Sequence, residues 1–184
     1  MLTDNNKLDK IKRLSDKKYG WWLLMEEILE ILEQNSRYSD EEIALMVGKP
    51  VEEVKKAIKE YEEKNIIAGY TSLINWENTG KETVTALIEV KITPQRGVGF
   101  DKVAERIYKF DKVKACYLMS SGGFDLTVIV EGKSMKEVAL FVSGSLSCQE
   151  YVTGTATHFV LKKYKDHGRE FKEPKAPNRE AIFV

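Results

Sequence analysis

The sequence predicts an α+β protein with an N-terminal winged helix-turn-helix and a C-terminal ferredoxin-like unit of order βαββαβ. Two patterns carry this prediction. Up to residue 61 the apolar residues recur at helical spacing, whereas from residue 83 they alternate with polar residues, as in a half-buried strand. A polar break over residues 75–80 separates the patterns, and 184 residues are enough for two small domains.

The apolar stripe of residues 20–35 predicts the first helix of the N-terminal unit. Ser39 and Glu42 have the spacing of a capping box, in which both side chains accept hydrogen bonds from backbone N–H groups at a helix start. We therefore expect a second helix that follows Ser39 and ends at Gly48. Its inward residues are expected to be Ile43, Met46 and Val47.

Pro50 suits the first turn of a third helix, where its missing N–H costs no hydrogen bond. Val54, Ile58 and Tyr61 recur at i, i+4 and i+7 and are expected to form the buried stripe of this helix. Residues 66–74 then have the extended character of a β wing. The expected domain bounds are 1–19 for a polar, basic extension, 20–76 for the winged helix-turn-helix, 77–82 for a linker, 83–164 for the ferredoxin-like domain and 165–184 for a C-terminal tail.

The C-terminal unit is expected to place both of its helices on one face of a four-stranded sheet. The second of these helices opens with another capping box, formed by Ser134 and Glu137. The other sheet face stays open, and we expect it to form a homodimer through sheet-to-sheet contact. The expected strands are 83–94, 113–119, 126–130 and 155–161, and the expected first helix is 101–110. The residues expected on the open face are Leu87, Tyr117, Met119 and Thr127.

Composition excludes several classes of protein. No apolar run approaches the roughly 18–20 residues that a membrane span requires, and the first 20 residues lack the apolar core of a signal peptide. We therefore expect a cytoplasmic protein with no membrane partner. Cys116 and Cys148 lack C-x-x-C spacing and neighbouring histidines, so we expect buried, reduced thiols, no metal site and no cofactor.

Charge is distributed unevenly along a chain whose formal net charge is zero. Residues 1–19 carry six Lys/Arg against three Asp/Glu, residues 20–76 carry six against twelve, and the remainder carries 17 against 14. The winged unit is therefore acidic. The extension has two interpretations, a basic arm for nucleic acid or a solvated tail. Its basic residues are Lys7, Lys10, Lys12, Arg13, Lys17 and Lys18.

Two motifs, in this order, resemble the leucine-responsive regulatory protein (Lrp/AsnC) family. The segment "EEKNIIAGYT" is similar to the family's Glu-Glu-x-Gly-Val-Ile-x-Gly-Tyr, and "GGFD" is similar to its Gly-Asp-Phe/Tyr-Asp. The resemblance covers residues 22–163. It implies a sequence-specific, DNA-binding transcriptional regulator. The family's second domain binds a small effector, such as an amino acid, between subunits and assembles dimers into higher oligomers, often octamers.

On this resemblance, the third helix enters the major groove of double-stranded DNA, with its lysines on phosphates. A glutamate can accept a hydrogen bond from cytosine N4, but it also repels phosphate, so one subunit is expected to bind weakly. Several linked subunits would compensate for this weakness. We expect two ion pairs that break on DNA, Glu52 with Lys56 and Lys59 with Glu63. The candidate DNA-contacting residues are Lys49, Glu52, Glu53, Lys55, Lys56 and Lys59.

The turn around residues 120–125 has two interpretations. As a plain hairpin it needs no ligand, and its glycines supply positive φ angles. On the resemblance, its backbone N–H groups and the Asp125 carboxylate line a pocket between subunits that receives an amino acid's ammonium group. Met135 and His158 are then either ligand contacts or packed residues, and His158 could make the response sensitive to pH. The candidate effector-binding residues are Ser121, Gly122, Gly123, Asp125, Met135 and His158.

No P-loop, dinucleotide-binding fingerprint, H-E-x-x-H or nucleophile motif occurs, so we do not expect an enzyme. Two alternatives to the regulator stay open. One is a ligand-binding assembly protein whose winged domain no longer binds DNA. The other is a relative of haem-precursor decarboxylases, which would need a basic cleft with histidines, and the chain has only His158 and His167.

Overall fold

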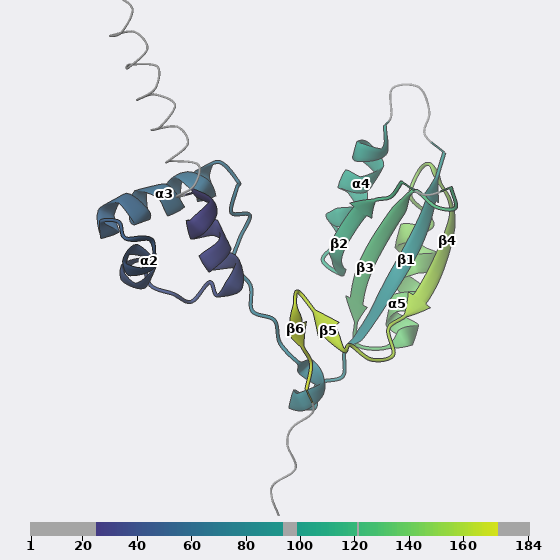
Figure 1. Ribbon diagram of the computed structural model, residues 1–184. Coiled ribbons are helices and arrows are strands. Elements are labelled where there is room, and N and C mark those ends of the chain that lie inside the picture. The colour runs from purple at the N-terminus through teal and green to yellow at the C-terminus, as the bar shows by residue number, and fades with distance from the viewer. Residues whose placement is uncertain (1–24, 94–98, 121, 173–184) are drawn as a thin grey trace, which may run out of the picture. The chain divides into compact units, whose positions relative to one another are not determined.

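The computed structural model describes residues 25–93, 99–120 and 122–172. The chain forms two compact units that divide between Ser72 and Leu73 (Figure 1). Residues 77–82, the expected linker, therefore lie in the second unit, and residues 76–79 form a short 3-10 helix, η1 (Trp76–Thr79). The basic extension 1–19, and Trp21 of the first helix, lie outside the described residues.

The described part of the N-terminal unit, residues 25–72, contains three helices: residues 25–34, α2 (Asp40–Val47) and α3 (Val51–Glu63). The capping box of α2 is confirmed, because the Ser39 hydroxyl accepts from the Glu42 N–H and the Glu42 carboxylate accepts from the Ser39 N–H. The helix ends at Gly48, whose φ of 64° is a left-handed conformation that glycine adopts at little cost. The buried core of the unit is Ile28, Ile43, Ala44, Val54, Ala57 and Tyr61.

Several details of the N-terminal unit differ from the expectation. Met46 is not an inward residue of α2: half of its surface is exposed, and Ala44 is buried instead. Pro50 caps α3 from outside the helix rather than lying in its first turn. Residues 66–74 contain no hydrogen-bonded strand, so the expected β wing is present only as irregular backbone. An extended apolar sequence does not become a strand without a neighbouring strand to pair with.

The C-terminal unit has the expected order of strands and helices, and its ferredoxin-like topology is confirmed. Its four strands form one antiparallel sheet in the spatial order β2-β3-β1-β4. Both helices pack on the same face of that sheet (Figure 1), and the short π-helical turn η2 (Val142–Leu146) extends the second helix. The elements are β1 (Val84–Ile92), α4 (Phe100–Tyr108), β2 (Val113–Leu118), β3 (Leu126–Gly132), α5 (Met135–Phe141) and β4 (Val152–Phe159).

Strand alternation decides which face each sheet residue occupies. Ile88 and Val90 of β1 are fully buried beneath the helices, together with Leu126 and Val128 of β3. The opposite face is uncovered in a single chain and mixes apolar with polar side chains. On that face, Leu87 lies opposite both Ile129 and His158, and Tyr117 lies opposite Thr127.

Residues 164–172 fold back onto the start of the C-terminal unit. They form a small hairpin of β5 (Lys165–Asp166) and β6 (Arg169–Glu170). The side-chain amides of Asn75 and Asn78 donate hydrogen bonds to the Lys172 carbonyl, at 3.5 and 3.1 Å. The expected tail therefore begins with ordered structure, and its remainder, 173–184, lies outside the described residues.

The cap of α5 is only half of the expected capping box. The Ser134 hydroxyl accepts from the Glu137 N–H at 3.1 Å, as predicted. The Glu137 carboxylate, however, accepts from the Lys133 N–H at 2.6 Å and from the Lys112 ammonium, rather than from Ser134. The hydrogen bond from Lys112, followed by that from the Lys133 backbone, lowers the pKa of Glu137.

Gly132 lies where β3 turns towards α5 and allows the helix to approach closely. A Cβ added at Gly132 would stand 3.0 Å from Cγ2 of the buried Val138 and 3.3 Å from the Glu137 carboxylate. Neither neighbour can move freely, because Val138 is packed in the core and Glu137 is held by hydrogen bonds.

We predict that Gly132→Ala destabilises the C-terminal unit by about 1–3 kcal/mol through this overpacking. Gly122→Ala is the matched control, because a Cβ at Gly122 meets nothing within 4 Å. Urea denaturation of the intact protein, followed by far-UV circular dichroism, measures the difference. Equal midpoints for the two variants would contradict the close approach.

Candidate nucleic-acid interface and effector loop

Helix α3 presents one side to the core and the other to solvent. Val54, Ala57 and Tyr61 are buried on the inner side, and Ile58 is half-buried beside them. Glutamates and lysines fill the outer side, as the helical period requires. All six candidate DNA-contacting residues are exposed: Lys49, Glu52, Glu53, Lys55, Lys56 and Lys59.

Most of these lysines face a carboxylate of the same unit. Lys49 lies 3.9 Å from Glu53, and Lys59 lies 3.9 Å from Glu63, the second of the two predicted pairs. Lys55 lies 3.5 Å from Glu41 of α2 and 3.9 Å from Glu52. The predicted pair of Glu52 with Lys56 is wrong, because Glu52 turns to Lys55 three residues along the helix.

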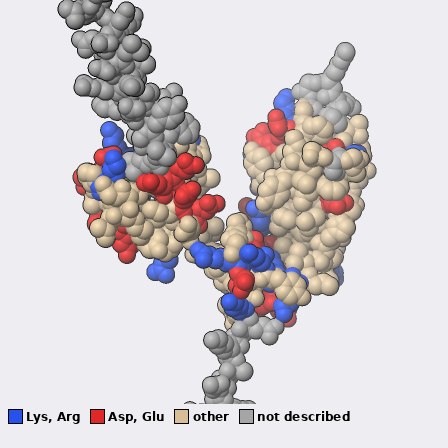
Figure 2. All heavy atoms as spheres, viewed as in Figure 1, with Lys and Arg blue, Asp and Glu red and all other residues tan. Residues whose placement is uncertain are grey.

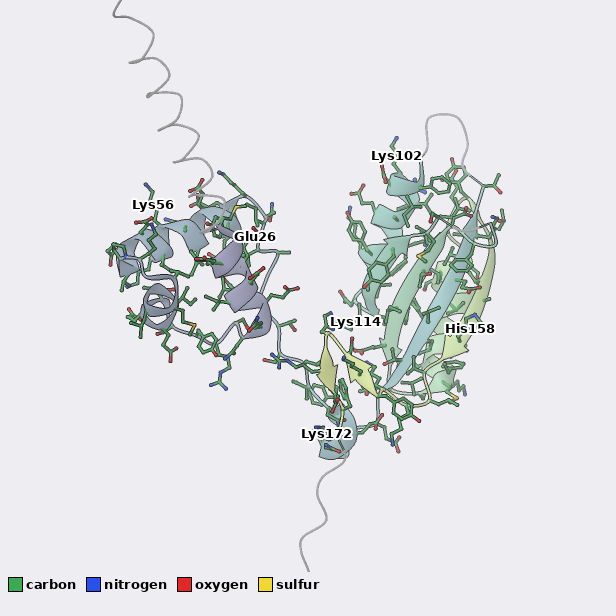
Figure 3. The ribbon with its side chains drawn as sticks, in the orientation of Figure 1. Glu26, Lys56, Lys102, Lys114, His158 and Lys172 are labelled. Atoms are coloured by element: carbon green, nitrogen blue, oxygen red, sulfur yellow. The ribbon has the colours of Figure 1, made fainter. Side chains whose placement is uncertain are left out.

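Lys56 differs from the other three lysines. It has no carboxylate within 4.0 Å among the described residues. Figure 3 shows it on α3, pointing away from the unit. Of the four lysines, Lys56 is therefore the one whose ammonium group can meet a phosphate without first leaving a described carboxylate.

The surface around α3 is predominantly acidic. Asp and Glu side chains gather on the face of the N-terminal unit visible in Figure 2. Glu41 lies in the first turn of α2, and a backbone hydrogen bond at the helix start, followed by the Lys55 ammonium, lowers its pKa. This carboxylate therefore stays charged at neutral pH and keeps its attraction for Lys55.

A groove of about 510 Å³ opens beside α3 within the same unit. Leu32, Ile43 and Ile58 form its apolar part, and Lys55 and Lys59 lie among its lining residues. Sequence reasoning did not assign a role to Tyr70, which also lines this groove. The Tyr70 hydroxyl donates to Glu62 at 2.9 Å, and burial followed by this carboxylate raises the pKa of Tyr70 to about 12.

The bond between Tyr70 and Glu62 ties the segment after α3 back to that helix. Both residues belong to the motif "EEKNIIAGYT", which begins at Glu62 and includes Tyr70. The family-like motif therefore has a structural role at this position, whatever it contributes to DNA binding.

Asp125 is a well-connected residue of the C-terminal unit. Its Oδ2 atom accepts from the Ile92 N–H at 2.7 Å, and the Lys91 ammonium lies 3.6 Å from the same oxygen. Its own N–H donates to the Val90 carbonyl, and its side chain is only 17% exposed. Asp125 therefore fixes the start of β3 against the end of β1, where the ladder between β1 and β4 shifts its register.

The glycines of the turn do not have the expected backbone conformation. Neither Gly122 nor Gly123 has a positive φ, so the turn does not need glycine for that reason. A Cβ at either position would meet nothing within 4 Å. The glycines instead leave the loop surface open. Ser121 lies outside the described residues.

The remaining candidate effector residues lie elsewhere on the unit. Met135 is half-exposed at the start of α5, beyond the opposite end of β3 from Asp125. His158 lies in β4 on the open sheet face, with its Nε2 atom 3.8 Å from Glu89. A single chain therefore does not bring Asp125, Met135 and His158 into one pocket.

The two thiols have different environments. Cys116 is half-buried, and burial raises the pKa of its thiol. Cys148, expected to be buried, is exposed and donates to the Ser143 carbonyl at 3.3 Å. Among the described residues, no three His, Cys, Asp or Glu side chains lie together as metal ligands would. None of the helices in this part of the chain has the length and apolar character needed to cross a bilayer.

Two families match consecutive parts of the chain. Residues 24–68 match a winged helix-turn-helix DNA-binding family, and residues 85–170 match the Lrp/AsnC ligand binding domain. These segments cover α2 and α3 of the N-terminal unit and all four strands of the sheet.

Several relatives align with most of the chain. The uncharacterised HTH-type transcriptional regulator YugG of Bacillus subtilis is 54% identical over 147 residues, which are 79% of this chain and 88% of YugG. The HTH-type transcriptional regulator LrpA of Pyrococcus horikoshii is 33% identical over 138 residues, 75% of this chain and 94% of LrpA.

Solved structures show the same fold. A transcriptional regulator of Neisseria meningitidis in complex with L-methionine matches with a TM-score of 0.61 and 23% identity, covering 78% of this chain and 91% of that one. The leucine response regulatory protein LrpA of Mycobacterium tuberculosis matches with a TM-score of 0.67 and 18% identity, covering 80% and 97%.

We predict that Asp125→Ala lowers the stability of the C-terminal unit by about 1–3 kcal/mol, because it leaves the Ile92 N–H without its charged acceptor. Thermal unfolding in the absence of any ligand measures this loss. Lys91→Ala, which removes only the exposed ion pair, should cost much less. An unchanged unfolding temperature for Asp125→Ala would show that the hydrogen bond to Ile92 is not structural.

Proposed function

The chain belongs to the Lrp/AsnC family of DNA-binding transcriptional regulators, and from that premise we propose that it is a sequence-specific regulator controlled by a small effector. The relatives are transcriptional regulators, which implies a role other than catalysis. The effector is an amino acid or a related metabolite bound between subunits of the C-terminal domain. The protein acts on DNA in the cytoplasm.

The DNA contacts of this proposal come from α3. Its exposed side inserts into the major groove, and its lysines neutralise phosphates. Lys56 is the principal phosphate contact, because it is the α3 lysine without a described carboxylate partner. Three further lysines bind phosphates after each has left its carboxylate partner: Lys49, Lys55 and Lys59. The bases are contacted by Glu52 and Glu53. The exposed lysines and glutamates along α3 are the observation that best supports DNA binding by this helix.

The open face of the sheet supports assembly as part of the same proposal. Tyr117 is 56% exposed there, on the same face as Leu87 and Ile129, and such a mixed face gains stability when a second sheet covers it. We propose a homodimer through these sheets and a higher oligomer, such as an octamer, built from dimers. Several reading units on one assembly compensate for weak binding by each.

The effector site is proposed to lie between subunits for a geometric reason. Asp125 and Met135 lie at opposite ends of β3, so a pocket that uses both needs residues from two chains. The open surface at Gly122 and Gly123 gives room for a ligand beside Asp125. The relative from Neisseria meningitidis was solved with L-methionine, which supports an amino acid as the class of effector.

The acidic N-terminal unit favours a second candidate function, a ligand-binding assembly protein whose winged domain does not bind DNA. Residues 20–76 carry twice as many carboxylates as basic residues. This candidate and the regulator differ in one measurable property, the affinity for DNA at a stated salt concentration.

We predict that Lys56→Ala weakens DNA binding uniformly across sequences and reduces the slope of log K against log salt by about one unit. Fluorescence anisotropy with duplexes made from genomic fragments, measured over a series of salt concentrations, gives both quantities. The matched control is Lys114→Ala, which removes the same charge from β2 of the C-terminal unit (Figure 3).

Equal salt slopes for wild type, Lys56→Ala and Lys114→Ala would remove Lys56 from the interface. Absence of DNA binding by the wild-type protein even at low salt would favour the ligand-binding assembly protein instead.

We also predict that a panel of amino acids changes the assembly of the wild-type protein but not that of Gly122→Leu. A Cβ at this position meets nothing within 4 Å, so we expect the leucine side chain to block the proposed pocket while the chain still folds. Sedimentation velocity with and without each amino acid measures the change. An equal ligand response of both proteins would place the effector elsewhere.

A further inference from the structure

The carboxylates around α3 are arranged as partners for its lysines. Lys55 is the clearest case, because its ammonium lies near two of them, Glu41 from α2 and Glu52 from α3 itself. Glu53 stands in the same relation to Lys49. By contrast, four glutamates of the first helix are exposed and lie on a different element: Glu26, Glu27, Glu30 and Glu33.

We infer that Glu41, Glu52 and Glu53 raise the sequence specificity of the N-terminal unit, because their ion pairs with its lysines compete with DNA phosphates for those lysines. The inference rests on the proposed DNA-binding function and adds a mechanism to it. Glu52 and Glu53 lie on α3 and face the DNA directly. Glu41 lies on α2 and is a positioning residue, because it acts through Lys55.

The ion pairs between these glutamates and the lysines are weak enough for DNA to break them. Their distances of 3.5–3.9 Å and the exposure of both partners make them weak, so a phosphate can replace a carboxylate at little cost. Each carboxylate nevertheless competes with phosphate for the lysine and repels phosphate itself. The effective number of phosphates that the helix neutralises is therefore smaller than its number of lysines.

Specific and non-specific DNA respond differently to these carboxylates. Non-specific binding depends almost entirely on phosphate contacts. Its affinity therefore falls by the whole free energy that the carboxylates remove from those contacts. At a specific site, a glutamate near the start of α3 can accept a hydrogen bond from cytosine N4 and recover part of the loss. The carboxylates therefore lower the affinity for non-specific DNA more than the affinity for a specific site, and the ratio of the two affinities rises.

The test is the variant Glu41→Gln/Glu52→Gln/Glu53→Gln in the full-length chain. Its matched control is Glu26→Gln/Glu27→Gln/Glu30→Gln, which changes the net charge by the same amount on the helix 25–34, where Figure 3 labels Glu26. Two duplex probes of equal length are used, a genomic fragment selected by the wild-type protein and a scrambled version of it. Binding is measured over about 50–200 mM salt, the range in which phosphate contacts change affinity strongly.

We expect the affinity of the triple variant for the scrambled duplex to rise by about two- to fivefold for each carboxylate removed. Its salt slope on that duplex should steepen by about one unit or more, and its preference for the selected fragment should fall. The control variant should show a much smaller rise and an unchanged preference.

Two results would overturn the inference while the proposed function stands. One is an equal rise for the triple variant and the control, which would make net charge the cause. The other is a wild-type protein that binds DNA and a triple variant that binds it no better. If neither the wild type nor the triple variant binds DNA at low salt, the proposed function fails and the inference fails with it.

Discussion

The C-terminal unit depends on one constraint, the alternation of side chains along β1 between the helix-covered face and the open face of the sheet. This central strand pairs with β3 on one side and β4 on the other, so its register fixes both neighbours. Its buried residues, such as Ile88 and Val90, support the helices, and its other residues, such as Leu87, form the open face. A shift of one residue would exchange the two faces. The helix-covered core and the surface available for assembly are therefore set by a single strand.

In the proposed function, the two units contribute to DNA recognition in different ways, and the acidic charge of the N-terminal unit is the reason. If α3 binds DNA as proposed, the acidic N-terminal unit limits the affinity that one helix gains from phosphates, because Lys49, Lys55 and Lys59 already face carboxylates. A shared assembly raises the effective concentration of further reading helices without adding contacts. In the proposed function, weak binding by one subunit and oligomerisation through the sheet are complementary parts of one mechanism.

Sequence patterns predicted the fold well where a local rule decides the outcome. Helical and strand periods predicted the order of elements, and a three-residue spacing predicted the cap of α2 at Ser39. The failures lie where long-range contacts decide. The Glu137 carboxylate accepts from the Lys133 N–H and the Lys112 ammonium because the start of β2 brings Lys112 near. Residues 66–74 form no strand because they pair with no strand among the residues that the structure describes. All six candidate DNA-contacting residues lie on exposed surfaces, whereas the side chain of Asp125 is largely buried. Neither the partner of Glu52 nor the structural role of Asp125 could be predicted from spacing alone.

The structural role of Asp125 also limits how an effector can act. One of its carboxylate oxygens already holds the Ile92 N–H and faces Lys91, so a ligand's ammonium group would have to share that oxygen or use the other one. A ligand shifts an equilibrium between assemblies only if it binds one of them more tightly than the others. A pocket inside one chain distinguishes between assemblies only if assembly changes its shape, whereas a pocket that needs Asp125 from one subunit and residues of a second exists only where the two meet. The separation of Asp125 from Met135 along β3 therefore makes assembly itself the property that an effector at these residues would control.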